Sequence, residues 1–308
     1  MLAKSKSETL AMASRALVLG GGGPVGIAWE SGLLAGLARA GVDLGKADFI
    51  LGTSAGSFVG ARLAMGAETD KLADPIVADA ESPVRPMNRG GRPPPDLSKL
   101  MRLMAAAQSA EREPEAARVE VGAYALEAET MSEDEFIASF GRSFAALPDD
   151  TWPERGFACT AVDVETGAFR LWTKDAGVGV TRAVASSCAV PGVYPPMTLQ
   201  GRRWMDGGIR SSTNADLATG HDVVVVVAVQ PRNLTPGGAL IRTFARLDEE
   251  VESLKAGGAK VVVLTPDEAS QEAMGPNLMD FRKRAPAARA GLAQGEALAR
   301  DLWLWAAA

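Results

Sequence analysis

The chain has 308 residues, 47% of them hydrophobic, and a formal net charge of -6 at pH 7. This is enough material to bury the core of an enzyme-sized domain, and the 32 lysines and arginines are too scattered to suggest a nucleic-acid partner. The apolar runs at 223–229 and 259–264 are far shorter than the roughly 20 residues of a membrane-spanning helix. We therefore expect a cytoplasmic protein, for which peripheral contact with a membrane surface stays open.

The first part of the chain repeats one pattern. Residues 1–14 carry early positive charge but lack the apolar stretch of a signal peptide, and we expect a flexible lead-in before a single domain at 15–308. The apolar run Ala16–Leu19 is followed by glycines and a helical spacing of apolar residues, and Phe49–Leu51 is followed in the same way by Gly52–Gly56 and a second helical pattern. Repeated strand, turn and helix units predict a parallel sheet covered by helices.

Residues 81–150 differ from the rest in their prolines and clustered charges, and we expect a variable inserted region with an amphipathic segment at 97–104. Regular structure resumes after it. The predicted elements are strands 157–163 and 168–173 joined as a hairpin, a helix at 183–189 ended by Pro191, strands 221–229 and 260–264, and helices 240–255 and 286–305. Cys159 and Cys188 have no metal-ligand spacing and are expected to be reduced core thiols.

The segment Gly52–Gly56 matches the pattern G-x-S-x-G, with Ser54 at its centre. In such a turn a strand passes abruptly into a helix, and the strained serine presents its hydroxyl in a pocket. The N-terminus of the following helix favours the anion that forms when a serine attacks a carbonyl group. Ser54 is therefore a candidate nucleophile, although a turn of small residues before a helix would give the same pattern.

A glycine-rich segment, Gly20–Gly26, joins the first strand to the first helix, and its bare N–H groups suit an anion. One interpretation is a dinucleotide site, which needs an acidic residue about 20 positions later at the end of a second strand. Asp43 and Asp48 lie in that range, but neither ends a convincing strand. A second interpretation is an oxyanion hole formed by Gly21, Gly22 and Gly23, and a third is a purely structural turn.

A serine that attacks an ester needs a base within hydrogen-bond reach. The chain contains one histidine, His221, which reads most simply as a residue at the edge of the 221–229 strand. A carboxylate is the alternative, and Asp206 in the sequence Asp206-Gly207-Gly208 is the best placed, since the glycines allow a tight ordered loop. An Asp-Gly hairpin turn after the strand Arg202–Trp204 remains a structural explanation of the same residues.

Together and in this order, the glycine loop, the Ser54 motif and Asp206-Gly207-Gly208 resemble the patatin-like phospholipase family, as does the segment 185–196. The resemblance covers about residues 16–264. It implies a three-layer α/β/α fold with a mostly parallel central sheet. It also implies a Ser-Asp dyad that hydrolyses acyl esters of lipids without a metal or an organic cofactor. Ser54 would be the nucleophile, Asp206 the proton acceptor, and Gly21, Gly22 and Gly23 the oxyanion hole.

One position departs from the family pattern, because Val25 stands where the glycine loop often has Arg or Lys. The missing charge makes a phospholipid head group less certain and leaves neutral esters open as substrates. The apolar residues of the inserted region predict either a lid or acyl-chain wall, or ordinary core; they are Leu97, Leu100, Met101, Leu103 and Met104. A non-catalytic module that binds a lipid or a nucleotide is the competing class of function.

Overall fold

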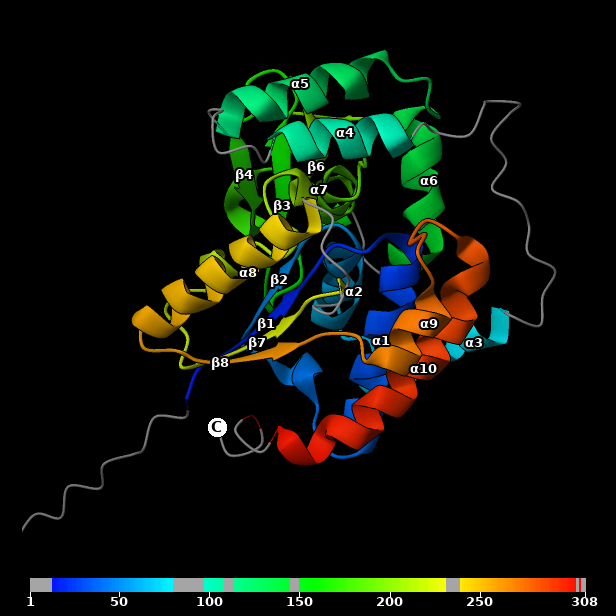
Figure 1. Ribbon diagram of the computed structural model, residues 1–308, viewed down its shortest axis with the longest axis vertical. Helices are drawn as coiled ribbons and strands as arrows, with labels where there is room; N and C mark the ends of the chain where they lie inside the picture. The colour runs from blue at the N-terminus through cyan, green and yellow to red at the C-terminus, as the bar shows by residue number, and fades with distance from the viewer. Residues whose placement is uncertain are drawn as a thin grey trace, which may run out of the picture.

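The computed structural model describes residues 13–79, 97–107, 114–144, 150–230, 239–302 and 305. Most of the predicted lead-in lies outside these residues and stays a prediction, as does much of the inserted region. Within the described part, the strands form one sheet of eight, in the order β5-β6-β3-β2-β1-β7-β8, with β4 also paired to β3 (Figure 1). The strands are β1 (Arg15–Leu19), β2 (Phe49–Gly52), β3 (Gly156–Asp163), β4 (Phe169–Trp172), β5 (Met197–Leu199), β6 (Arg202–Asp206), β7 (Val223–Val227) and β8 (Lys260–Leu264).

The centre of the sheet is parallel and its β3 side is antiparallel. β1 pairs in parallel with both β2 and β7, and the pairs β2–β3 and β7–β8 are parallel as well. β6 runs antiparallel to β3 and to β5, while β3 and β4 form the predicted hairpin. The sheet is thus mixed and mostly parallel, as predicted. The Asp-Gly hairpin is absent, since β6 is followed by a short 3-10 turn at Gly207–Ile209 and pairs with no later strand of the described part.

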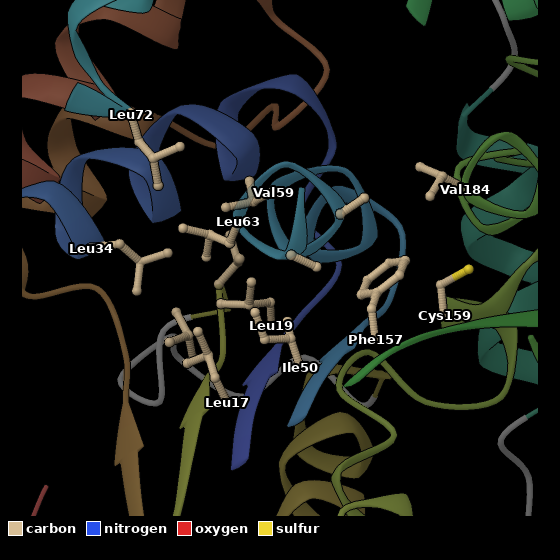
Figure 2. Close-up of a cluster of buried hydrophobic side chains, with 14 of the residues drawn as sticks. Leu17, Leu19, Leu34, Ile50, Val59, Leu63, Leu72, Phe157, Cys159 and Val184 are labelled. Carbon is tan, nitrogen blue, oxygen red and sulfur yellow. The ribbon is translucent and has the colours of Figure 1, made fainter. Parts of the chain in front are cut away.

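Helices cover both faces of the sheet (Figure 1). Leu17 and Leu19 of β1 pack with α1 and α2, whereas Ala16 and Val18, which point to the other face, pack with α8. Figure 2 shows the first of these clusters between the sheet and the helices. The helices are α1 (Gly23–Arg39), α2 (Ala55–Ala64), α3 (Asp74–Ala78), α4 (Leu97–Ala107), α5 (Pro114–Glu127), α6 (Glu133–Phe144), α7 (Val180–Ser187), α8 (Ala239–Ala256), α9 (Glu268–Met274) and α10 (Arg284–Leu298). The expected three-layer α/β/α fold is confirmed.

The inserted region contributes α4, α5 and α6, which gather at one end of the molecule in Figure 1. Leu100 of α4 is buried with Val121 of α5 and Val162 of β3, and Leu103 packs against the same cluster. Met101 is 55% exposed. The core interpretation therefore applies to Leu100 and Leu103, while the side chains of Leu97 and Met104 lie outside the described residues. The idea of a lid stays a prediction.

Helices α1 and α10 meet along a seam of four glycines, which are Gly32, Gly36, Gly291 and Gly295. A Cβ atom added to Gly32 would lie 2.1 Å from the carbonyl oxygen of Ala288, and one added to Gly295 would lie 2.2 Å from that of Leu33. The two backbones are thus in direct contact, which only glycine allows. α10 ends at Leu298, short of the predicted 305, in a 3-10 turn. None of the described helices has the length and apolarity to cross a membrane.

Candidate active site

Ser54 occupies the turn between β2 and α2, and we call Gly52–Gly56 the Ser54 turn. Its backbone has φ 51° and ψ -117°, a strained conformation for a residue other than glycine. A Cβ atom on Gly52 would lie 2.3 Å from the Cα of Ser57, and one on Gly56 would lie 2.1 Å from the carbonyl oxygen of Leu19. The two glycines of the motif are therefore required by close packing, and they allow the turn to hold Ser54 at the carboxyl end of the strand.

The backbone of Ser54 is held by hydrogen bonds with the distant residues Ser187 and Cys188 and with the nearby Ser57. Its N–H donates to Oγ of Ser187 at 3.0 Å, and its carbonyl oxygen accepts from the thiol of Cys188 at 3.1 Å. The hydroxyl of Ser57 donates to the same carbonyl oxygen at 2.6 Å. These contacts offset the strain of the turn, which costs about 1–3 kcal/mol. Both Cys159 and Cys188 are free, as predicted.

Asp206 ends β6 and is 4% exposed, close to the 6% of Ser54. Its Oδ1 accepts from the N–H of Gly208 at 2.7 Å, while its own N–H donates to the carbonyl oxygen of Ala189 at 3.0 Å. Oδ2 is buried and has no hydrogen-bond partner among the described residues. Burial raises the pKa of Asp206 to about 7, against the opposing effects of the Ser54 hydroxyl and the Gly208 N–H. The carboxyl thus lies beside the Ser54 hydroxyl, which favours its ionised form.

The glycine loop, Gly20–Gly23, faces the Ser54 turn. A Cβ atom on Gly21 would lie 3.4 Å from the Cβ of Ser54. The N–H of Gly21 donates to the carbonyl oxygen of Ser212 at 2.7 Å, whereas those of Gly22 and Gly23 donate to no backbone acceptor in the described part of the chain. Both belong to the N-terminus of the long helix α1, where uncommitted N–H groups favour an anion. These two N–H groups are therefore the candidate oxyanion donors of the loop.

Two further residues lie near the site and are not among those predicted from the sequence. Ser187 lies in the segment 185–196 that resembles the family, but its contact with Ser54 is visible only in three dimensions. Glu30 is fully buried in α1, and neither of its carboxylate oxygens has a hydrogen-bond partner among the described residues. Burial raises its pKa well above the usual range, and the backbone of Gly20 in the glycine loop opposes this shift. An acid within an apolar helical pattern was the available signal for Glu30.

His221 lies far from Ser54 along the sheet. Its ring stacks on Phe49 with centroids 5.3 Å apart, and Nδ1 lies 3.2 Å from the carbonyl oxygen of Ala218. It precedes the amino end of β7, whereas Ser54 follows the carboxyl end of β2, and both strands run parallel to β1 between them. His221 is a strand-edge residue, and a carboxylate is the group placed beside Ser54.

The acidic residues that a dinucleotide site would use lie at the wrong end of the sheet. Oδ2 of Asp48 accepts from the N–H of Arg15 at 2.7 Å, at the amino ends of β1 and β2. Oδ1 of Asp43 accepts from the N–H of Gly45 and caps a 3-10 turn. Neither carboxylate is near the carboxyl ends of the strands, where the glycine loop lies. In the part of the chain that is described, no group of three or more His, Cys, Asp or Glu residues could hold a metal ion.

The site defines a class of protein: an α/β protein with a strained serine between a parallel strand and a helix, beside a buried carboxyl and a glycine loop. The family model described as patatin-like phospholipase matches residues 17–219, and the chain belongs to this family. Membership supports lipid hydrolase activity and a lipid substrate. Val25, which stands where the resemblance led us to expect a basic residue, is fully buried in the core and brings no cation to the site.

Solved structures similar to the chain include the two that follow. VipD from Legionella pneumophila is 14% identical, with a TM-score of 0.42, over 94% of this chain and 67% of that one. The type III effector protein ExoU is 17% identical, with a TM-score of 0.36, over 92% of this chain. The match spans about half of ExoU, 53% of its length. No curated protein matches the sequence.

Proposed function

We propose that the protein is a lipid acyl-ester hydrolase in which Ser54 is the nucleophile and Asp206 is its base. One observation carries the proposal: a strained serine adjoins a buried carboxyl whose Oδ2 has no hydrogen-bond partner among the described residues. An unpartnered oxygen is available to accept the hydroxyl proton. Family membership supports the choice of a lipid ester as the substrate.

The first half of the reaction forms an acyl-enzyme. Oγ of Ser54 attacks the ester carbonyl carbon while its proton passes to Oδ2 of Asp206. The N–H groups of Gly22 and Gly23 stabilise the oxyanion; that of Gly21, also expected in this role, is committed to Ser212. The tetrahedral intermediate collapses, the bond from carbon to the alcohol oxygen breaks, and the leaving alcohol takes the proton from Asp206.

The second half releases the fatty acid. A water molecule attacks the acyl carbon, and Asp206 accepts its proton. The new intermediate then expels Oγ of Ser54, which regains the proton from the carboxyl. A carboxyl with a pKa near the usual value of about 3.9 is a weak base for this work. Burial raises the pKa of Asp206 to about 7, which brings it close to neutral pH and strengthens it as a proton acceptor.

The test measures turnover of a p-nitrophenyl ester and labelling by a fluorophosphonate probe. We expect Ser54→Ala to lose labelling, and both Ser54→Ala and Asp206→Asn to lose about 10⁴-fold or more of kcat. Ser31→Ala is the matched control, because Ser31 is a fully buried serine of α1 whose hydroxyl has no partner among the described residues. Wild-type turnover in Ser54→Ala would overturn the proposal. Absence of labelling in the wild-type protein would favour a non-catalytic lipid-binding module instead.

The proposed function extends to the lipid head group that the enzyme prefers. Since Val25 is buried and uncharged, the loop offers no cation at this position to a phosphate group. We expect neutral glycerides to be cleaved at least as fast as a phosphatidylcholine with the same acyl chains. Fatty-acid release from matched mixed micelles measures this ratio, and a strong preference for the phospholipid would contradict the expectation.

A further inference from the structure

The loop that follows Asp206 contacts both turns of the site: the carbonyl oxygen of Ser212 accepts from the N–H of Gly21, and the side chain of Asn214 reaches Thr53. Asn214 is fully buried and adopts the left-handed conformation, with φ 51° and ψ 34°. Among residues with a side chain, asparagine and aspartate enter this region most readily. The backbone at this position therefore already selects a short polar side chain.

The side-chain amide of Asn214 joins the two halves of the proposed dyad. Its Nδ2 donates to Oγ1 of Thr53 at 3.0 Å and lies 3.3 Å from the carbonyl oxygen of Gly207. A third contact, at 2.7 Å, reaches the carbonyl oxygen of Ser211 within the same loop. Thr53 immediately precedes Ser54 in the chain, and Gly207 immediately follows Asp206. One amide group thus bridges the residue before the serine and the residue after the carboxylate.

The orientation of this amide is fixed by Arg210. Nη1 of Arg210 donates to Oδ1 of Asn214 at 2.8 Å, and a guanidinium group can only donate. Oδ1 must therefore face Arg210, which leaves Nδ2 facing the three oxygens. Asp216 holds Arg210 in turn through two hydrogen bonds, of 3.0 and 2.6 Å.

Further hydrogen bonds surround Asn214. Thr53 Oγ1 also accepts from Thr160 of β3, at 3.0 Å. Glu250 of α8 is 2% exposed and accepts from Oγ1 of Thr213 at 2.6 Å and from the N–H of Ala215 at 2.9 Å. Thr213 and Ala215, on either side of Asn214, are thereby bonded to α8, which lies on the face of the sheet opposite α1 and α2. The amide is held in place and can act as a fixed spacer.

We propose that Asn214 is a positioning residue that sets the separation of Ser54 and Asp206. The inference rests on the proposed function, since it concerns the geometry of that dyad. A displacement of about 1 Å in a reacting group can cost about 100-fold in rate. A dyad without a histidine has a single proton acceptor, so its rate depends directly on this separation.

The test uses two substitutions that both tolerate the left-handed backbone. Asn214→Asp keeps the size and the contact with Arg210 but removes the donors, and Asn214→Gly removes the whole side chain. We expect each to lower kcat by about 30–100-fold with KM within about twofold, and to slow fluorophosphonate labelling in proportion. Gln294→Glu is the matched control: Gln294 is a buried amide of α10 that bonds Trp29 and Thr265, away from the dyad. We expect its kcat to stay within about threefold of wild type.

A second pair tests the same bridge from its other end. Thr53→Val keeps the shape of the side chain but removes the acceptor, and it should lower kcat with little change in KM. Thr53→Ser keeps the hydroxyl, and its kcat should stay close to that of wild type. Wild-type kcat in the folded Asn214 variants, or an equal loss in Gln294→Glu, would overturn the positioning role. If Ser54→Ala is inactive while these variants keep kcat, the positioning role alone fails. Wild-type turnover in Ser54→Ala removes the proposed function, and the positioning role with it.

Discussion

The glycine loop and the Ser54 turn have the same sequence pattern, a short apolar strand followed by glycines and a helix, yet they expose different chemistry. In the glycine loop, the N–H groups of Gly22 and Gly23 have no backbone acceptor among the described residues. In the Ser54 turn, the N–H of Ser54 donates to Ser187, and that of Gly56 donates to Gly20 at 2.9 Å. The glycine loop thus offers backbone N–H groups to a ligand. The Ser54 turn uses its backbone N–H groups in internal hydrogen bonds and offers the side chain of Ser54 instead.

The two turns are also joined directly. The carbonyl oxygen of Gly20 accepts from Gly56, and that of Leu19 accepts from Thr53 at 3.0 Å. The proposed oxyanion donors are therefore held at a fixed distance from the Ser54 hydroxyl by backbone contacts that no side chain mediates. A substitution in either turn should therefore also displace the other turn, which mutagenesis can test.

The largest effect should come from separating the turns. In Gly56→Ala the new Cβ would lie 2.1 Å from the carbonyl oxygen of Leu19, which cannot move without shifting β1. We expect a loss of about 3 kcal/mol in the free energy of unfolding, together with loss of esterase activity. Urea denaturation measures the first. Gly257→Ala at the end of α8, where the nearest atom would be 3.3 Å away, is the control and should cost less than about 1 kcal/mol.

A smaller effect should follow from moving the backbone donors alone. A Cβ atom on Gly22 would lie 2.5 Å from Cγ1 of Val229 and 2.9 Å from the Cα of Gly26. We expect Gly22→Ala to lower kcat by about 100-fold, the usual cost of one oxyanion donor, with a modest change in KM. Adding Val229→Ala removes part of the clash and should recover part of the rate. Unchanged kcat in Gly22→Ala would assign the glycine loop a structural role only.

The pH dependence should distinguish the contribution of the Asp206 side chain from that of the backbone donors. Because Asp206 must be ionised to accept a proton and its pKa is raised to about 7, kcat/KM should fall about tenfold per pH unit below that value. For stability the sign is opposite: a raised carboxyl pKa contributes stability that is full below the unfolded-state value and lost as the pH rises through about 7. Rate profiles and urea midpoints of wild type and Asp206→Asn measure both. A rate that stays flat between about pH 5 and 8 would exclude Asp206 as the base.

The smallest effect concerns Glu30 of α1, the helix that begins at the glycine loop. Burial raises the pKa of Glu30, so this residue also loses its contribution to stability as the pH rises above its unfolded-state value. Glu30→Gln cannot ionise, and its urea midpoint should match wild type at acid pH and exceed it increasingly toward alkaline pH. Parallel midpoint curves for the two proteins would show that Glu30 is not neutral in the folded state.

Local patterns were sufficient for much of the fold. The β-branched run Lys260–Leu264 forms β8 with the expected bounds, and the glycine-bounded segment Phe49–Gly52 forms β2, since apolar runs flanked by turn residues are read locally. The dyad candidates were found because each lies in its own short motif. Asn214 and Ser187 could not be found this way, because their contacts span 161 and 133 residues of chain.

The pKa of Asp206 illustrates the same limit. A carboxyl in a loop sequence suggests an ordinary acid. Its pKa is raised by burial, and Asp206 is in contact with residues as distant in the chain as Ala189, which follows α7, and Ala161 of β3. The structure ends α10 at Leu298, before the predicted bound at 305. Ala-rich sequence favours a helix at these positions but does not indicate where the contact of the helix with the rest of the protein ends.

The glycine seam between α1 and α10 also limits how the sequence can change over evolutionary time. Each of its four positions faces a carbonyl group of the opposite helix at a distance that excludes a methyl group, so no single substitution at the seam is neutral. A larger residue at any of these positions would require α1 and α10 to move apart. Because α1 begins at the glycine loop, the loop would then be displaced. Relatives that keep the loop in place should therefore retain glycine at all four positions or change them together.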